Sequence, residues 1–133
     1  MREGGSKDRL NINDELIIGK HLYANLYGVK KELLNDEELI RNTVLEAVKA
    51  SGATLVEVKS WRFGGRKGGV SAIALVTESH IAIHTWVEYE YATVDIYTCG
   101  QHTEPWRGFE AVLNILKPRK YRVGYVDRSQ TTL

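Results

Sequence analysis

Residues 77–88 concentrate groups that could do acid–base or nucleophilic chemistry, in a segment whose other residues are typical of a buried strand. The segment contains two acids, a serine and two histidines: Glu78, Ser79, His80, His84 and Glu88. Burying such polar groups is unfavourable unless they are paired or hydrogen-bonded. A single histidine in a strand is usually structural, but two histidines flanked by acids indicate a functional site.

One hypothesis is a metal site, because His80, His84 and Glu88 are spaced by four residues. On a helix this spacing would place all three side chains on one face. In an extended strand, His80 and Glu88 would lie about 26 Å apart, at about 3.3 Å per residue, which is too far to bind one ion. The sequence therefore predicts no metal site here.

Two further hypotheses use a nucleophile. The single cysteine of the chain, Cys99, could pair with His84 as a thiol nucleophile and its base, although no third member of such a site is evident. Alternatively, the Ser79 hydroxyl could attack the carbonyl of Glu78 and cleave the backbone between them. The residue types alone leave this choice open.

The elements predicted around this segment are mainly strands. Alternating, β-branched and aromatic residues predict strands over residues 16–26, 53–61, 70–76, 80–87, 91–99 and 121–126. Helical spacing predicts one helix after an Asn35 N-cap and a second with Thr103 as N-cap and Pro105 near its first position. The order β-α-β-β-β-β-α-β predicts a single α+β domain over residues 1–133, in which two helices cover one face of a mainly antiparallel sheet.

The positions of two candidate residues conflict with an unbroken strand at the proposed cleavage point. Ser79 and His84 differ in parity, so an unbroken strand would point their side chains to opposite faces. We therefore expect a bulge or a loop near Ser79.

Several short motifs together resemble the signature of the pyruvoyl-dependent S-adenosylmethionine decarboxylase family, of the small prokaryotic type. The resemblance spans residues 17–126, nearly the whole chain. It is carried by residues 78–80, by residues 83–86 with Glu88, by residues 98–100, and by residues 69–71, which are similar to the second serine motif of that family.

The resemblance implies a proenzyme that cleaves itself between Glu78 and Ser79, giving a β chain 1–78 and an α chain 79–133. The α chain would begin with a pyruvoyl group derived from Ser79, whose ketone forms a Schiff base with the substrate amine and accepts the electrons released with CO₂. The resemblance also implies roles for five more residues: His84 as the acid or base of processing, Ser71 as its assistant, Cys99 as proton donor, Glu88 as a substrate-binding acid, and Phe63 as an aromatic that stacks on adenine.

Two activities occur in this family, and both feed polyamine biosynthesis. Most members are implied to decarboxylate S-adenosylmethionine, and a crenarchaeal branch converts L-arginine to agmatine. The sequence departs from the common pattern at Val87, at Ala72 and in the glycine-rich stretch 64–69, and residues 126–129 resemble the arginine branch. Arginine is therefore the favoured substrate. Phe63 and Glu88 are retained, so S-adenosylmethionine remains the alternative.

Composition limits the partners and the setting. The 18 Lys and Arg residues nearly balance the 17 Asp and Glu residues, so there is no electrostatic basis for binding nucleic acid or an anionic membrane. No apolar run approaches the roughly 20 residues that span a bilayer. Residues 1–14 are polar, which predicts a flexible tail and not a signal peptide. The lone cysteine fits a reducing compartment, so a cytoplasmic location is predicted.

The resemblance further implies a dimer of αβ protomers, in which two sheets face each other with the helices outside as an αββα sandwich. Two non-enzymatic hypotheses stand beside it: a homologue without pyruvoyl that regulates a partner decarboxylase, and a small-molecule binding module with structural histidines. The presence of Ser79, His84 and Cys99 together disfavours both.

Overall fold

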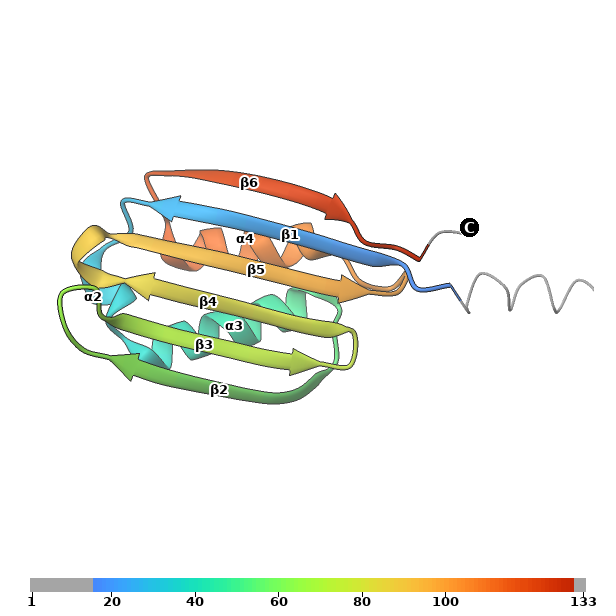
Figure 1. Ribbon diagram of the computed structural model, residues 1–133, viewed down its shortest axis with the longest axis horizontal. Coiled ribbons are helices and arrows are strands. Elements are labelled where there is room, and N and C mark those ends of the chain that lie inside the picture. Colours follow the sequence, from blue (N-terminus) through green and yellow to red (C-terminus); the bar gives the residue numbers. More distant parts are fainter. Residues whose placement is uncertain (1–15, 131–133) are drawn as a thin grey trace, which may run out of the picture.

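A computed structural model describes residues 16–130, which form one six-stranded sheet with helices packed on one face (Figure 1). The elements in chain order are β1 (Gly19–Tyr27), α2 (Lys31–Leu34), α3 (Glu37–Ser51), β2 (Leu55–Phe63), β3 (Gly69–Val76), β4 (Ser79–Trp86), the 3₁₀ turn η1 (Val87–Tyr89), β5 (Tyr91–Cys99), α4 (Pro105–Leu116) and β6 (Lys120–Asp127). The strand order is β2-β3-β4-β5-β1-β6, and each neighbouring pair is antiparallel. The predicted α+β class and element order are confirmed, with the short α2 and η1 as additions.

Alternation of side chains along the strands gives the sheet one covered face and one open face. Even-numbered residues of β1, β3 and β5 and odd-numbered residues of β4 point toward α3 and α4, where they form the core with residues such as Leu22, Ile83, Ile96 and Phe109. The opposite residues of these strands, together with odd-numbered residues of β2 and even-numbered residues of β6, form what we term the open face. Within residues 16–130, no helix is long and apolar enough to cross a membrane.

Helix α3 begins one residue later than the sequence predicts. Its N-cap is Asp36, whose side chain accepts a hydrogen bond from the backbone amide of Leu39 at 3.0 Å. Asn35, the predicted cap, instead ends α2, because its amide donates to the Lys31 carbonyl at 2.9 Å. The helix ends at Ser51, and Gly52 follows in the left-handed conformation at φ 78°.

Helix α4 is also capped one residue later than predicted. Glu104, not Thr103, is the N-cap, and its side chain accepts from the Trp106 amide at 3.3 Å. The Thr103 hydroxyl is engaged elsewhere, within 3.0 Å of the Thr98 hydroxyl. Gly108 lets α4 approach α3 closely, because a Cβ at this position would lie 2.1 Å from the Ser51 hydroxyl.

The strand boundaries agree with the predicted ranges to within about three residues, and the predicted strand at 91–99 matches β5 at both ends. The first strand begins at Gly19, three residues after the predicted start. The tail predicted for residues 1–14 lies outside the described residues.

Candidate active site

The predicted cleavage point lies in a tight turn between β3 and β4. Residues 77–78 form the turn, and Ser79 is the first residue of β4, opposite Val76. The ladder runs from this pair to Ser71 and His84 without a register shift, so there is no bulge, and the break in the strand is the turn itself. Ser79 has φ 143°, a conformation rare for an L-residue that re-aims its side chain. Such backbone strain costs on the order of 1–3 kcal/mol and often occurs at functional sites.

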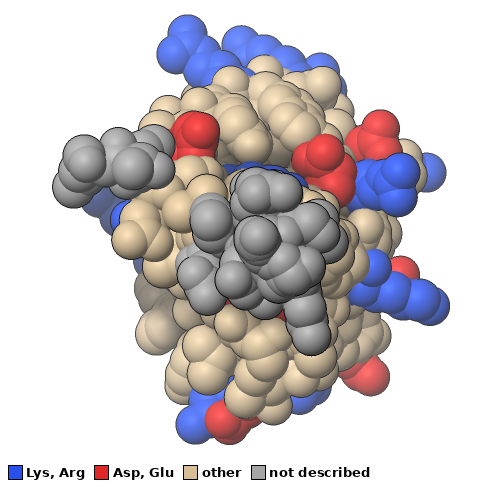
Figure 2. Space-filling view, turned by 90° about the vertical axis from the view of Figure 1, so that its right-hand side faces the viewer, with Lys and Arg blue, Asp and Glu red and all other residues tan. Residues whose placement is uncertain are grey.

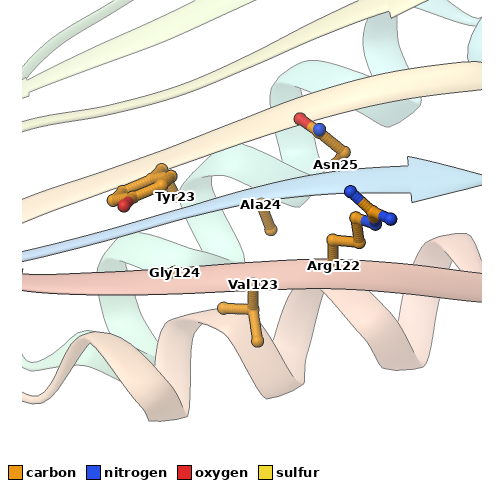
Figure 3. Close-up of a pocket in the computed structure, with 6 residues that line it drawn as sticks. All are labelled: Tyr23, Ala24, Asn25, Arg122, Val123 and Gly124. Atoms are coloured by element: carbon orange, nitrogen blue, oxygen red, sulfur yellow. The ribbon is translucent and has the colours of Figure 1, made fainter.

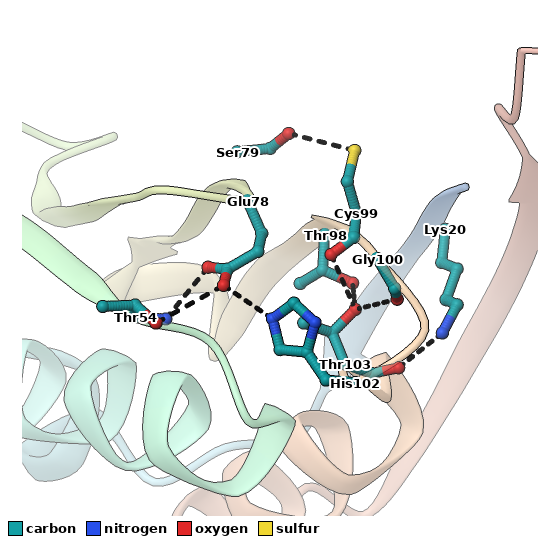
Figure 4. Close-up of polar contacts among 9 residues, drawn as sticks. All are labelled: Lys20, Thr54, Glu78, Ser79, Thr98, Cys99, Gly100, His102 and Thr103. Carbon is teal, nitrogen blue, oxygen red and sulfur yellow. Dashed lines mark hydrogen bonds and ion pairs between the residues drawn. The ribbon is translucent and has the colours of Figure 1, made fainter. Parts of the chain in front are cut away.

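The Ser79 hydroxyl lies beside the thiol of Cys99. The distance from Ser79 Oγ to Cys99 Sγ is 3.7 Å, and either atom could be the donor. Cys99 ends β5, and the Thr103 hydroxyl contacts the Cys99 carbonyl at 3.2 Å from the following loop (Figure 4). The structure thus brings together two of the predicted catalytic residues from strands that are adjacent in the sheet.

Glu78 is held from two other segments of the chain (Figure 4). Its Oε1 accepts a hydrogen bond from the Thr54 amide at 2.9 Å, and its Oε2 lies 2.8 Å from His102 Nε2. The Glu78 side chain is only 10% exposed. Burial raises its pKa, but hydrogen bonds from the Thr54 amide, His102 and Thr77 outweigh this and lower the pKa to about 2. Glu78 is therefore ionised at neutral pH.

His80 is next to the cleavage point, and its ring packs against Tyr97 on the open face, with centroids 5.6 Å apart. Burial lowers the pKa of His80; Asp95 opposes this, while His21 and Arg128 add to it. Asp95 is itself bonded to His21, with 2.7 Å between Oδ1 and Nε2. Within residues 16–130, no three His, Cys, Asp or Glu side chains are grouped in a way that could bind a metal ion.

Ser71 and His84 form a second pair at the other end of the same strands. They are direct neighbours across β3 and β4, with 2.8 Å between Ser71 Oγ and His84 Nδ1. His84 follows Ser79 by five residues of regular strand, which corresponds to about 16 Å. Within one chain, the pair is therefore out of reach of the Ser79 hydroxyl.

The same geometry overturns the hypothesis of a Cys99–His84 nucleophile pair within one chain. His84 pairs with Thr93 in the ladder between β4 and β5, and Cys99 lies six residues farther along β5. Six residues of strand correspond to about 20 Å, too far for the histidine to deprotonate the thiol.

Phe63 and Glu88, the predicted substrate-binding residues, line one cavity of about 310 Å³ at the Ser71–His84 end of the sheet. The other lining residues are Asn35, Arg62, Gly64, Gly65, Gly68, Gly69 and Val87, so the glycine-rich stretch forms part of its wall. Phe63 is 55% exposed, and the Glu88 side chain is 63% exposed, with Lys31 Nζ 4.0 Å from its carboxylate. Arg62 donates a hydrogen bond to the side-chain oxygen of Asn35 at 2.6 Å, so this hydrogen-bond partner carries no charge.

The candidate residues thus form two groups at opposite ends of the sheet (Figure 1). The cleavage-turn group consists of Glu78, Ser79 and Cys99, and the histidine group consists of Ser71 and His84 with the Phe63–Glu88 cavity beside it. Figure 2 views the molecule from the cleavage-turn end; outside the grey atoms, acidic and basic side chains lie around the rim of this view, with uncharged residues between them.

A further pocket lies between β1 and β6, away from both groups (Figure 3). Its volume is about 230 Å³, and Tyr23, Asn25 and Arg122 are among the residues that line it. Gly124 allows the Tyr23 ring to lie across β6, because a Cβ there would be 2.5 Å from the ring. None of the predicted site residues lines this pocket.

Comparison with known proteins shows which family the chain belongs to. Residues 20–129 match the family model described as S-adenosylmethionine decarboxylase. The chain belongs to the S-adenosylmethionine decarboxylase family. The resemblance predicted from the short motifs is therefore confirmed over most of the chain.

Two relatives in the S-adenosylmethionine decarboxylase family are named arginine decarboxylase proenzyme. The protein from Aeropyrum pernix is 59% identical over 117 residues, which cover 88% of this chain and 89% of the relative. The protein from Hyperthermus butylicus is 56% identical over 115 residues, which cover 86% of this chain and 81% of the relative. Among solved structures, the adenosylmethionine decarboxylase from Aquifex aeolicus VF5 superposes with a TM-score of 0.78 at 32% identity, over 86% of this chain and 93% of that chain.

Sequence reasoning missed two residues that contact the cleavage turn of this S-adenosylmethionine decarboxylase family member. Thr54 lies between α3 and β2, and His102 lies in the loop between β5 and α4. Neither belongs to a recognisable motif. They lie 24 residues from Glu78 on either side, so only the folded chain brings them together.

Proposed function

We propose that this chain is the proenzyme of a pyruvoyl-dependent decarboxylase that cleaves itself between Glu78 and Ser79 and converts L-arginine to agmatine and CO₂. The observation that carries this proposal is the strained Ser79 in the β3–β4 turn, with its hydroxyl 3.7 Å from the Cys99 thiol. The names of the two archaeal relatives, at 59% and 56% identity, support arginine as the substrate.

The cleavage balances with the residues present and one water molecule. Ser79 Oγ bonds to the Glu78 carbonyl carbon as the peptide C–N bond breaks, and the hydroxyl proton moves to the released nitrogen. Loss of the Ser79 Cα proton then breaks the Cβ–O bond and frees the Glu78 α-carboxylate. The remaining enamine tautomerises to an imine, and water hydrolyses it to the ketone with release of ammonia.

The residues around Ser79 fit the pyruvoyl group that would result. Such a group supplies a ketone that withdraws the electrons released with CO₂. The Cys99 thiol, at 3.7 Å from Ser79 Oγ, would supply a proton to the substrate carbon after CO₂ leaves. This role requires a reduced thiol, which supports the predicted cytoplasmic location.

The topology supports a cleaved protein that stays folded. Strand β1 belongs to the proposed β chain but lies between β5 and β6 of the proposed α chain. Likewise, β3 of the β chain pairs with β4 of the α chain. The core is likewise shared by both parts. Cutting the β3–β4 turn would therefore leave two interleaved chains held by sheet hydrogen bonds and a common core.

A complete site requires the two groups of residues to meet, and we propose that they do so between two copies of the chain. A two-fold axis between two open faces, perpendicular to the strands, would place the cleavage turn of one copy over the His84 end of the other. Exposed apolar residues support this contact, among them Tyr23, Trp61, Ile73 and Leu75 of the open face. His84 and Ser71 of one copy would then serve Ser79 of the other, giving the predicted αββα dimer.

The Phe63–Glu88 cavity, lying beside the histidine group, would bind the far end of the substrate in this arrangement. A carboxylate such as Glu88 pairs well with a guanidinium, and an aromatic face such as that of Phe63 attracts the same cation. S-adenosylmethionine is the second candidate, because the family model and the Aquifex aeolicus structure carry that name and an exposed aromatic ring also stacks on adenine.

Two measurements test the proposal. Mass spectrometry of the purified protein should find fragments 1–78 and 79–133, the second beginning with pyruvoyl, whereas Ser79→Ala should give one intact chain. The cleaved protein should then release labelled CO₂ from carboxyl-labelled L-arginine and much less from S-adenosylmethionine. An intact wild-type chain would refute self-cleavage, and the opposite preference would establish the second candidate.

A further inference from the structure

We propose that His102 is a positioning residue for self-cleavage, acting through the side chain of Glu78; this inference rests on the proposed function. His102 does not touch the scissile bond. Its Nε2 lies 2.8 Å from Glu78 Oε2, while the Thr54 amide donates to Glu78 Oε1 at 2.9 Å. Both carboxylate oxygens are thus occupied by donors from different segments, which fixes the rotation of the whole side chain (Figure 4).

The turn itself is anchored at a third point. The Thr77 amide donates to the Thr54 carbonyl at 3.0 Å, so the start of β2 holds the turn residue that precedes Glu78. The contact from His102 is the one that reaches Glu78 from the opposite side of the turn, out of the β5–α4 loop. Without it, Glu78 keeps the hydrogen bonds from Thr54 and from its chain neighbour Thr77.

The position of Glu78 matters because its carbonyl carbon is the electrophile of the proposed cleavage. Ser79 immediately after it has φ 143°, which ordinary strand geometry would not retain unless the flanking residues were held. A carboxylate bound on both oxygens provides that restraint on one side, and the sheet ladder of β4 provides it on the other. Loosening the Glu78 side allows the turn to relax, which changes where the Ser79 hydroxyl lies relative to the Glu78 carbonyl.

The contact also spans the cleavage point. Glu78 would become the last residue of the β chain, whereas His102 lies in the α chain 79–133. After cleavage, the His102–Glu78 contact would therefore be a bond between the two fragments that keeps the new carboxyl terminus docked next to the residue derived from Ser79.

The first test compares His102→Leu with His102→Gln. The leucine variant removes the donor, and the glutamine variant keeps a nitrogen donor near the position of Nε2. Each proenzyme is made uncut by a short pulse of cell-free synthesis, and cleavage is timed on a denaturing gel. We expect His102→Leu to cleave about tenfold or more slowly than wild type, because misalignment of reacting atoms has large effects on rate. His102→Gln should stay within about threefold of wild type, because it preserves the hydrogen bond.

A merely structural role for His102 would not give this pattern. Equal cleavage rates for His102→Leu and wild type would overturn the inference, as would a glutamine variant as slow as the leucine variant. A wild-type chain that never cleaves would instead refute the proposed function itself. If His102→Leu does not fold, Glu78→Ala removes the same contact from its other end. Glu78→Ala also removes the hydrogen bonds from Thr54. Where both variants fold, the double variant should be no slower than Glu78→Ala, because Glu78→Ala already removes the contact that His102→Leu removes.

Discussion

The two ends of the open face differ in how their functional groups are held. At the cleavage turn, Glu78 and Ser79 are restrained by loops from both sides, and the backbone of Ser79 is in a rare conformation. At the other end, Ser71 and His84 lie in regular strands and hydrogen-bond directly across the ladder. Under the proposed function, one end would provide the residue that attacks the backbone and the other the acid–base pair. The site would then consist of two halves that are held in different ways.

Inactivating one end at a time should have the largest effects. His84→Ala should slow self-cleavage at least about 100-fold, because a positioned acid–base group typically contributes that much. Ser79→Ala cannot cleave at all. If the two ends meet between copies, making both variants in one cell should restore cleavage of the His84→Ala chain. In the mixed dimer, Ser79 of that chain would meet the intact His84 of the Ser79→Ala chain. A denaturing gel with differently tagged chains measures this. No restoration in a confirmed mixed dimer would show that the two ends act within one chain.

Substituting Cys99 should affect substrate decarboxylation but not self-cleavage. We expect Cys99→Ala to cleave itself but to decarboxylate about 100-fold more slowly, because the proton donor beside Ser79 is lost. Cleavage is followed by gel and CO₂ release by radiolabel. Cys99→Ser, which keeps a hydroxyl donor, should fall between wild type and alanine. Wild-type turnover of Cys99→Ala would remove the thiol from the mechanism.

Phe63 tests the cavity at the histidine end. Phe63→Ala should raise the KM for the substrate about tenfold and change kcat little, because the ring contacts a part of the substrate that does not react. Phe63→Tyr, which keeps the aromatic face, should have a KM near that of wild type. A fall in kcat without a change in KM would assign Phe63 to the chemistry and not to binding.

The pH dependence of stability provides another test of the cleavage turn. The pKa of Glu78 is lowered from its ordinary value of 4.5 to about 2, so its ionised form stabilises the folded chain above pH 4.5 and this contribution is lost as pH falls toward 2. We expect the free energy of unfolding of the uncut Ser79→Ala protein to fall by about 2 kcal/mol more between pH 5 and pH 3 than that of Ser79→Ala with Glu78→Gln. Urea unfolding at both pH values gives this difference. Parallel pH profiles would contradict the depressed pKa.

Much of the fold follows from local patterns. Alternation along residues 91–99 predicted β5 at both ends, because one face of that strand is buried and the other open. The helix caps were each predicted one residue too early, since Asn35 and Thr103 have the right chemistry but are used by a preceding turn and by the loop after β5. Of the bulge or loop expected at Ser79, the structure has a turn and no bulge. Parity describes regular strands, and a single unusual φ changes the direction of the side chain without shifting the register.

Short motifs and periodicities of a few residues were enough to predict the candidate site residues, the family and the order of elements. The folded chain was needed to show that Ser79 lies beside Cys99 and not near His84, and that Thr54 and His102 contact Glu78. These contacts join segments more than ten residues apart, whose proximity is set by strand register and loop packing. Spacing along the chain does not encode that proximity, since residues close in sequence on one strand can lie at opposite ends of the sheet.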